Sequence, residues 1–327
     1  MSCRCAIMSM LLLLCVSQFG LPQNRANSSA VQDSTIKVDV DLVIINATVT
    51  DREDHAVAGL EPTSFRIWED KVQQQIAYVS AEDVPASLGI VLDISGSMQD
   101  KISAARAAAV AFLKDGISED EYFLVEFNGH PRVAQDFTRN ISQLRNRLTS
   151  GRAHGMTAMY DAVYLSLEKL KAGRNPKKAL LLITDGDDNQ SRYKVSELAE
   201  FLKEGDVQIY AIGIAHDNSE LSRGGSDRAA IEELTELSGG RAFFPDSVQE
   251  LEEICTKIAL ELKTQYVIGY KSTNLTKDGK WRKIHLELDR HKRRHHLTVR
   301  SKSGYYAPVD KHLRPKISYR SRAVRRT

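Results

Sequence analysis

Between residues 86 and 263, short apolar runs alternate with stretches of helical length, and this alternation restricts the fold more than any other feature. Apolar runs of about four to eight residues are typical of strands that are buried on both faces. When a helical stretch separates each run from the next, the strands pair in parallel and the helices cross over between them. The region therefore predicts an α/β domain with a doubly wound, mostly parallel sheet of about six strands flanked by helices.

The expected elements follow from this pattern. The expected strands cover residues 88–92, 122–127, 132–135, 179–184, 207–214 and 241–244. The expected helices cover residues 99–114, 141–148, 158–171, 194–203, 229–237 and 248–262.

Oxygen-bearing side chains cluster directly after the first of these strands. The run Leu88-Gly89-Ile90-Val91-Leu92 ends in Asp93-Ile94-Ser95-Gly96-Ser97, which sets one carboxyl and two hydroxyl groups at alternate positions of a tight turn. In open α/β sheets, ligands bind at the carboxyl ends of strands. Oxygen donors favour a hard divalent cation, so Mg²⁺, Mn²⁺ and Ca²⁺ are the candidates. The alternative interpretation is a serine-rich N-cap on the following helix, which needs no metal.

Two further oxygen donors complete a known pattern. A second strand-like run ends in Thr184-Asp185-Gly186, and the loop at 151–158 contains a threonine ahead of a helix. Together these residues resemble the metal-ion-dependent adhesion site of von Willebrand factor type A domains, written Asp-x-Ser-x-Ser with a distant Thr and a distant Asp. The matching residues are Asp93, Ser95, Ser97, Thr157 and Asp185. Mg²⁺ is the preferred ion, with Mn²⁺ or Ca²⁺ as alternatives.

The resemblance also implies roles for these residues. In the family, the two serines and the threonine touch the metal, whereas the two aspartates act through water or by hydrogen-bonding the serines. A strand at 132–135 would fit the antiparallel edge strand of such domains. With few direct carboxylate ligands the cation stays electron-poor, so it seeks a further anionic oxygen. An Asp or Glu of a protein partner can supply that oxygen.

The chain lacks the short motifs of common enzymes. No Gly-x-Ser-x-Gly elbow, His-Glu-x-x-His, P-loop or Cys-x-x-Cys is present. We therefore expect an adhesion-type binding protein and no enzyme. Two alternatives stay open at this point. One is a hydrolase that uses the same cation as a Lewis acid, and the other is an accessory scaffold with a vestigial site.

β patterns flank the α/β region, residues 86–263, on both sides. The expected strands cover residues 36–50, 65–70, 75–79, 265–270, 281–288 and 296–300. A ribbon of two or three strands is marginal in water, so we expect 36–84 and 265–308 to form one β-sandwich with the α/β domain inserted. Two independent ribbons are the alternative. The shared faces should carry Val38, Val40, Leu42, Phe65, Trp68, Val267, Ile284, Leu286, Leu297 and Val299.

This arrangement also resembles the von Willebrand type A–related proteins seen in acidobacterial genomes. The resemblance covers most of residues 36–308. Apart from the metal motif, the matching stretches are 49–51, 65–70, 266–270 and 302–308.

The two ends of the chain have compositions of their own. Arg4 followed by the apolar Cys5 to Val16 predicts a signal peptide over residues 1–20, which is too short to span a bilayer. A lipoprotein anchor at Cys15 is disfavoured by the bulky Leu14 before it. Residues 21–35 are interpreted as a flexible lead and 309–327 as a solvated basic tail. We therefore expect a secreted or periplasmic protein.

Charge and cysteine content add two expectations. The net charge of +2 gives no sign of a nucleic-acid partner, and no other segment is long and apolar enough to cross a membrane. Three of the four cysteines lie in the expected signal peptide. The fourth, Cys255, lies on the apolar face of an amphipathic helix, so we expect a buried thiol and no internal disulfide. The partner's identity and the oligomeric state do not follow from the sequence.

Overall fold

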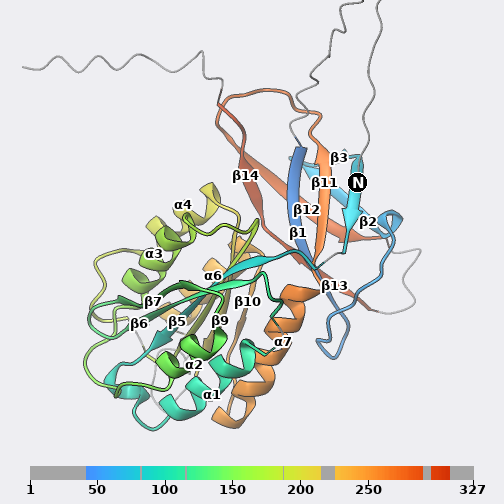
Figure 1. Cartoon of the computed structure of the whole chain (residues 1–327). Coiled ribbons are helices and arrows are strands. Elements are labelled where there is room, and N and C mark those ends of the chain that lie inside the picture. The colour runs from blue at the N-terminus through green and yellow to red at the C-terminus, as the bar shows by residue number, and fades with distance from the viewer. Residues whose placement is uncertain are drawn as a thin grey trace, which may run out of the picture. The chain divides into compact units, whose positions relative to one another are not determined.

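A six-stranded sheet forms the centre of the α/β region, with the strand order β10-β9-β8-β5-β6-β7 (Figure 1). The computed structural model describes residues 42–81, 83–114, 116–186, 188–214, 225–289 and 296–309. The strands are β5 (Ala86–Asp93), β6 (Glu121–Phe127), β7 (Arg132–Thr138), β8 (Lys177–Thr184), β9 (Val207–Gly213) and β10 (Arg241–Phe243). Pairing is parallel except at the edge strand β7, which runs antiparallel to β6. The predicted fold class is confirmed.

Helices cover both faces of this sheet. On one side lie α1 (Ile102–Phe112), α2 (Ile141–Leu148) and α7 (Leu251–Lys263), and on the other lie α3 (Met159–Leu170), α4 (Val195–Glu204) and α6 (Ser226–Ser238). The strand β5 shows how one sequence supplies both cores, because its side chains alternate between faces. Ile90 and Leu92 pack with α1 and α7, whereas Val91 packs with α3 and α4.

The first helix begins later than the sequence predicts. The expected start was residue 99, but Gly96–Met98 form a 3-10 turn, and α1 begins at Ile102. The backbone N–H of Gly96 donates to the carbonyl oxygen of Gly155 at 3.0 Å. This bond ties the turn to a neighbouring loop, and the α-helix starts after the turn.

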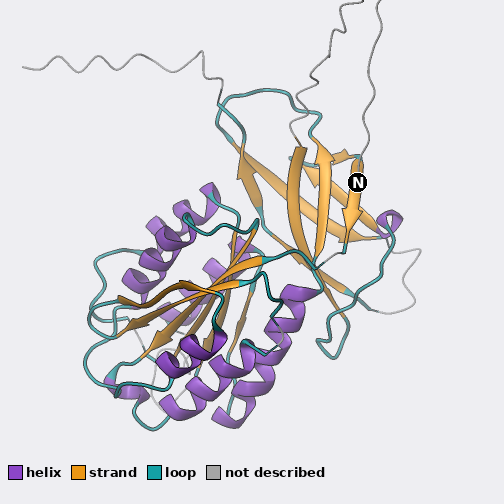
Figure 2. Cartoon of the chain, viewed as in Figure 1, coloured by secondary structure: helices purple, strands orange, loops and turns teal. Residues whose placement is uncertain are grey.

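The flanks form two antiparallel sheets apart from the helices (Figure 2). Their strand orders are β13-β1-β11-β4 and β14-β12-β2-β3. Their strands are β1 (Leu42–Thr50), β2 (Phe65–Glu69), β3 (Val72–Gln74), β4 (Ile76–Ser80), β11 (Tyr266–Lys271), β12 (Trp281–Leu288), β13 (Thr298–Ser301) and β14 (Gly304–Tyr306). Each sheet contains strands from both flanks, since β1 pairs with β11 and β13, and β2 pairs with β12. The two sheets share one apolar core, which includes Ile45, Ile67 and Ile268. The two flanks therefore form one sandwich.

Some residues expected in that core lie elsewhere. Phe65 and Ile67 point inward, so the pleat turns Trp68 outward, where its ring lies 5.8 Å from the His285 ring. Val267 and Leu42 are outside the core for the same reason, each being next to an inward-facing neighbour. Val38 and Val40 lie outside the described residues, as do the expected signal peptide, lead and most of the basic tail.

The buried inward position after Ile67 belongs to a charged residue, Glu69. Its carboxylate accepts hydrogen bonds from the hydroxyl groups of Tyr270 at 2.8 Å, Tyr305 at 3.0 Å and Ser272 at 2.7 Å. Burial and the neighbouring carboxylate raise the pKa of Tyr305 to about 12. These donors compensate the cost of burying Glu69 and connect strands of both sheets.

Polar contacts also join the sandwich to the α/β domain. Glu261 of α7 is only 1% exposed, and its Oε2 accepts a hydrogen bond from Arg300 Nη2 of β13 at 2.8 Å. Arg241 of β10 lies 4.0 Å from Glu261 Oε1 and donates two hydrogen bonds of 2.8 Å to Asp54. A buried carboxylate is therefore held between guanidinium groups of both modules.

Two further expectations concern single segments. Cys255 of α7 is fully buried, and burial raises the pKa of its thiol, which confirms the interpretation of a structural cysteine. Within the described ranges, the helices are too short or too polar to cross a bilayer.

Candidate metal centre

The predicted metal residues lie on three loops at the carboxyl edge of the central sheet. Asp93 ends β5, Asp185 follows β8, and Thr157 precedes α3. A backbone hydrogen bond ties the loop after β5 to the loop before α3, since His154 N donates to Ile94 O at 2.8 Å. The parallel arrangement of β5 and β8 brings together side chains that are about ninety residues apart in sequence.

The two serine hydroxyl groups are spaced as neighbouring ligands of a small octahedral cation would be. Ser95 Oγ and Ser97 Oγ lie 3.1 Å apart. Mg²⁺ binds oxygen at about 2.1 Å with right angles between neighbouring ligands, which puts adjacent ligand atoms about 3 Å apart. A Cβ atom built on Gly186 would lie 3.1 Å from Thr157 Oγ1 and 3.5 Å from Ser97 Oγ. The glycine thus keeps the space beside these hydroxyl groups open.

Both aspartates stand behind the hydroxyl groups and hold the loops. Asp93 Oδ1 accepts a bond from the backbone N–H of Ser95 at 2.7 Å, and Asp185 Oδ1 accepts one from Ser97 Oγ at 2.7 Å. Ser97 donates its proton to Asp185, so in its contact with Ser95 the Ser97 oxygen is an acceptor, the role that it would also have toward a cation. The donor set and its spacing therefore fit a divalent metal.

The electrostatics of Asp93 also fit a cation. Asp93 is fully buried, and desolvation raises its pKa to about 6 although hydrogen bonds from Thr184 and Ser95 act in the opposite direction. The nearby charge of Asp185 raises it further. A divalent cation would favour the charged form of Asp93.

Sequence reasoning missed three residues that shape this site. Thr184 Oγ1 donates to Asp93 Oδ2 at 2.6 Å, and Asn189 Oδ1 accepts from the backbone N–H of Thr157 at 3.0 Å. The ammonium group of Lys101 forms an ion pair with Asp185 Oδ2. Thr184 adjoins a predicted site residue, which was a usable signal. Asn189 gave none, because its role depends on which loop it faces.

Asp188, next to the site, has a structural role. Its Oδ2 accepts a hydrogen bond from the backbone N–H of Tyr160 at 3.0 Å, at the start of α3. Asp187 lies outside the described residues. His154, in the loop that carries Thr157, is exposed.

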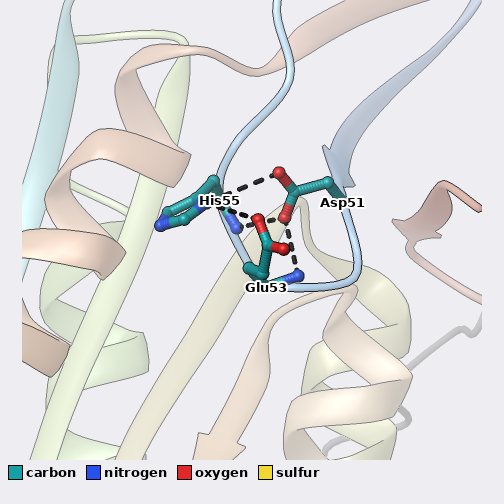
Figure 3. A group of neighbouring side chains, drawn as sticks. All are labelled: Asp51, Glu53 and His55. Carbon is teal, nitrogen blue, oxygen red and sulfur yellow. Dashed lines mark hydrogen bonds and ion pairs between the residues drawn. The ribbon is translucent and has the colours of Figure 1, made fainter. Parts of the chain in front are cut away.

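Asp51, Glu53 and His55 form a second group of possible metal ligands, in the loop after β1 (Figure 3). The Asp51 carboxylate accepts hydrogen bonds of 2.9 Å from the backbone N–H groups of both Glu53 and His55. The bond from the backbone of His55 is the main reason that the pKa of Asp51 is lowered. Glu53 is 79% exposed and His55 is 64% exposed in their side chains. The carboxylate is thus already used to stabilise a turn.

Comparison with known proteins decides the family. The model of the von Willebrand factor type A domain matches residues 88–257, slightly more than half of the chain. The chain belongs to the von Willebrand factor type A family. Type A domains are adhesion and protein-binding domains, and they commonly bind a divalent cation. Asp93, Ser95, Ser97, Thr157 and Asp185 all lie within the matched range.

Curated relatives resemble this chain over part of their length. Inter-alpha-trypsin inhibitor heavy chain 4 of Mus musculus is 26% identical over 230 residues, which cover 63% of this chain and 22% of that protein. An integrator complex subunit 6-like protein of Mus musculus is 26% identical over 233 residues, 58% of this chain and 27% of that protein. The chain therefore aligns with about a quarter of the length of these relatives.

Solved structures resemble this chain over part of its length. A von Willebrand factor type A protein from Catenulispora acidiphila is 12% identical, with a TM-score of 0.49 over 83% of this chain and 74% of that one. The PilB minor pilin from Streptococcus sanguinis is 16% identical, with a TM-score of 0.46 over 57% of this chain and 63% of that one.

Proposed function

We propose that this type A domain protein captures a protein partner through a divalent cation, Mg²⁺ in preference to Mn²⁺ or Ca²⁺. In this proposal Ser95, Ser97 and Thr157 bind the metal directly. Asp93 and Asp185 act from behind them, through hydrogen bonds or water. The partner supplies an Asp or Glu carboxylate as a further ligand.

One observation carries this proposal. Hydroxyl groups from two loops, those of Ser97 and Thr157, lie around the space beside Gly186, and Ser95 Oγ lies 3.1 Å from Ser97 Oγ. The carboxylates of Asp93 and Asp185 are turned to hydrogen bonds with Ser95 N and Ser97 Oγ. A cation held mainly by neutral hydroxyl groups keeps much of its positive charge. It therefore attracts an anionic oxygen from outside, and a carboxylate provides the hard oxygen ligand that Mg²⁺ prefers.

A capture experiment tests this function. The immobilised protein is incubated in Mg²⁺ with surface and secreted proteins of its source organism, and retained proteins are identified by mass spectrometry. We expect a partner that is retained in Mg²⁺, is lost in excess EDTA, and is lost with the double variant Asp93→Ala/Ser95→Ala. Converting the partner's carboxylates to amides should abolish its capture.

The matched control is Asp51→Ala, which removes a carboxylate from the turn shown in Figure 3 and should leave capture intact. Retention of the same partner in excess EDTA would contradict the proposal. That outcome would instead favour a scaffold whose metal site plays no part in binding.

We also propose that the protein acts outside the cytoplasm. The support is the sequence pattern of a positively charged Arg4 followed by the apolar stretch from Cys5 to Val16. N-terminal sequencing of the mature protein should give a start close to residues 17–21. A mature protein that still begins at Met1 would argue against cleavage by a signal peptidase.

A further inference from the structure

Asp185 already has a cationic partner that belongs to the chain itself. The ammonium group of Lys101 pairs with Asp185 Oδ2, while Asp185 Oδ1 accepts the bond from Ser97 Oγ at 2.7 Å. The Asp185 side chain is 0% exposed, and that of Lys101 is 18% exposed. The carboxylate that helps to orient a predicted metal ligand is thus neutralised by a lysine.

The position of this lysine is unfavourable apart from that contact. Lys101 is the N-cap residue of α1, and the first turn of the helix contains no acidic residue. The N-terminus of a helix carries a partial positive charge, so a cation placed there is disfavoured. Its side chain also forms no capping hydrogen bond. The ion pair with Asp185 therefore offsets the unfavourable placement of the Lys101 charge.

Asp185 needs such a partner when no metal is bound. A fully buried carboxylate without a counter-charge is strongly disfavoured. Thr184 and Ser95 donate hydrogen bonds to Asp93, but neither of them brings a positive charge to Asp185. The ammonium group of Lys101 supplies that charge.

We propose that Lys101 is a tethered counter-ion that stabilises the metal-free site and competes with the divalent cation for Asp185. The inference rests on the proposed function, because it concerns the same cation site. Two positive charges close to one buried carboxylate repel each other, even when the metal reaches the carboxylate through Ser97 or water, so metal binding must weaken or displace the Lys101 contact. Lys101 then raises the metal concentration that is needed to fill the site. It also stabilises the loops while no metal is bound.

The test compares Lys101→Met with wild type by calorimetric titration with Mg²⁺ and Mn²⁺ and by thermal melting in EDTA. Removing the ammonium group should tighten metal binding by at least about tenfold, the lower end of what a neighbouring charge does to such an equilibrium. The same variant should melt at a lower temperature than wild type in EDTA, and Mg²⁺ should restore the loss. A purely structural role for Lys101 would not tighten metal binding.

Two further variants keep the test decisive. Lys101→Gln removes the charge but keeps an N–H donor for Asp185, so it should fold without metal and still bind metal more tightly. Lys257→Met is the control, because Lys257 forms an ion pair with Glu253 on α7 at 2.8 Å, away from the metal site. This variant should change neither the metal affinity nor the rise in melting temperature that Mg²⁺ causes.

The possible failures are distinct. If wild type and both Lys101 variants bind metal with equal affinity, the counter-ion proposal is wrong and the metal site stands. If the Lys101 variants bind more weakly, Lys101 supports the metal instead of competing with it, and the proposal is also wrong. If none of the proteins binds metal, the proposed function fails together with the competition.

Discussion

Replacing Asp93 with alanine should weaken Mg²⁺ and Mn²⁺ binding by about 10- to 100-fold, the usual cost of losing a group that orients metal ligands. Asp93 is fully buried and bonds both the backbone N–H of Ser95 at 2.7 Å and the hydroxyl of Thr184 at 2.6 Å. Its loss removes a negative charge from the site and frees the loop that carries two of the proposed ligands. Calorimetric titration with each metal measures the effect.

Asp51→Ala is the matched control, since it removes a carboxylate from the competing cluster on the exposed turn. We expect its metal affinity to equal that of wild type. If Asp51→Ala lowered the metal affinity and Asp93→Ala left it unchanged, the metal would bind at the turn after β1 instead. Asp185→Ala should also lose affinity. This variant removes the anchor of Ser97 and the partner of Lys101 at once, so Asp93→Ala gives the clearer measurement.

The second large effect concerns the junction between the two modules. Arg300→Met should lower the free energy of unfolding of the sandwich by about 3 kcal/mol, the lower end of the range for breaking a buried ion pair. The reason is that Glu261, 1% exposed, would lose its 2.8 Å partner, while Arg241 stays 4.0 Å away as partial compensation. Urea unfolding followed by tryptophan fluorescence suits this measurement. Both tryptophans, Trp68 and Trp281, lie in sandwich strands.

The control is Arg66→Met in the same sandwich. Arg66 pairs with Asp289 at 2.9 Å, but its side chain is 42% exposed. Solvent screens such a pair, so its loss should cost no more than about 1 kcal/mol. Equal destabilisation by the two substitutions would show that burial of Glu261 does not set the strength of the Arg300 contact.

The order of the elements and the fold class followed from patterns in the sequence. The buried parallel strands β5 and β8 could be predicted from the sequence, because a short, continuous apolar run is typical of a strand that is buried on both faces. The α2 helix was predicted with its observed bounds, Ile141–Leu148. The face of a strand was harder to predict. Trp68 was assigned to the wrong face, since a bulky aromatic residue outweighed the period of two that Phe65 and Ile67 set.

The candidate site divides in the same way. Asp93, Ser95 and Ser97 lie within five residues, so a single loop brings them together and the sequence alone indicated their chemistry. Lys101 gave no such signal, because the expected helix at 99–114 has Asp100 in its first turn. Only the observed start of α1 at Ile102 puts Lys101 at the N-cap, ahead of a first turn without an acidic residue.

The sequence by itself determined the layered α/β architecture, the pairing of both flanks in one sandwich and the oxygen-rich loops. These features depend on local period, on turn chemistry and on the need of short ribbons to share a core. Only the tertiary structure decided that Lys101 reaches Asp185, that Asn189 holds the Thr157 loop, and that Glu261 lies between Arg300 and Arg241. Each of these contacts joins residues far apart in the chain. Their partners are fixed by how the strands and helices pack in three dimensions, which no local pattern encodes.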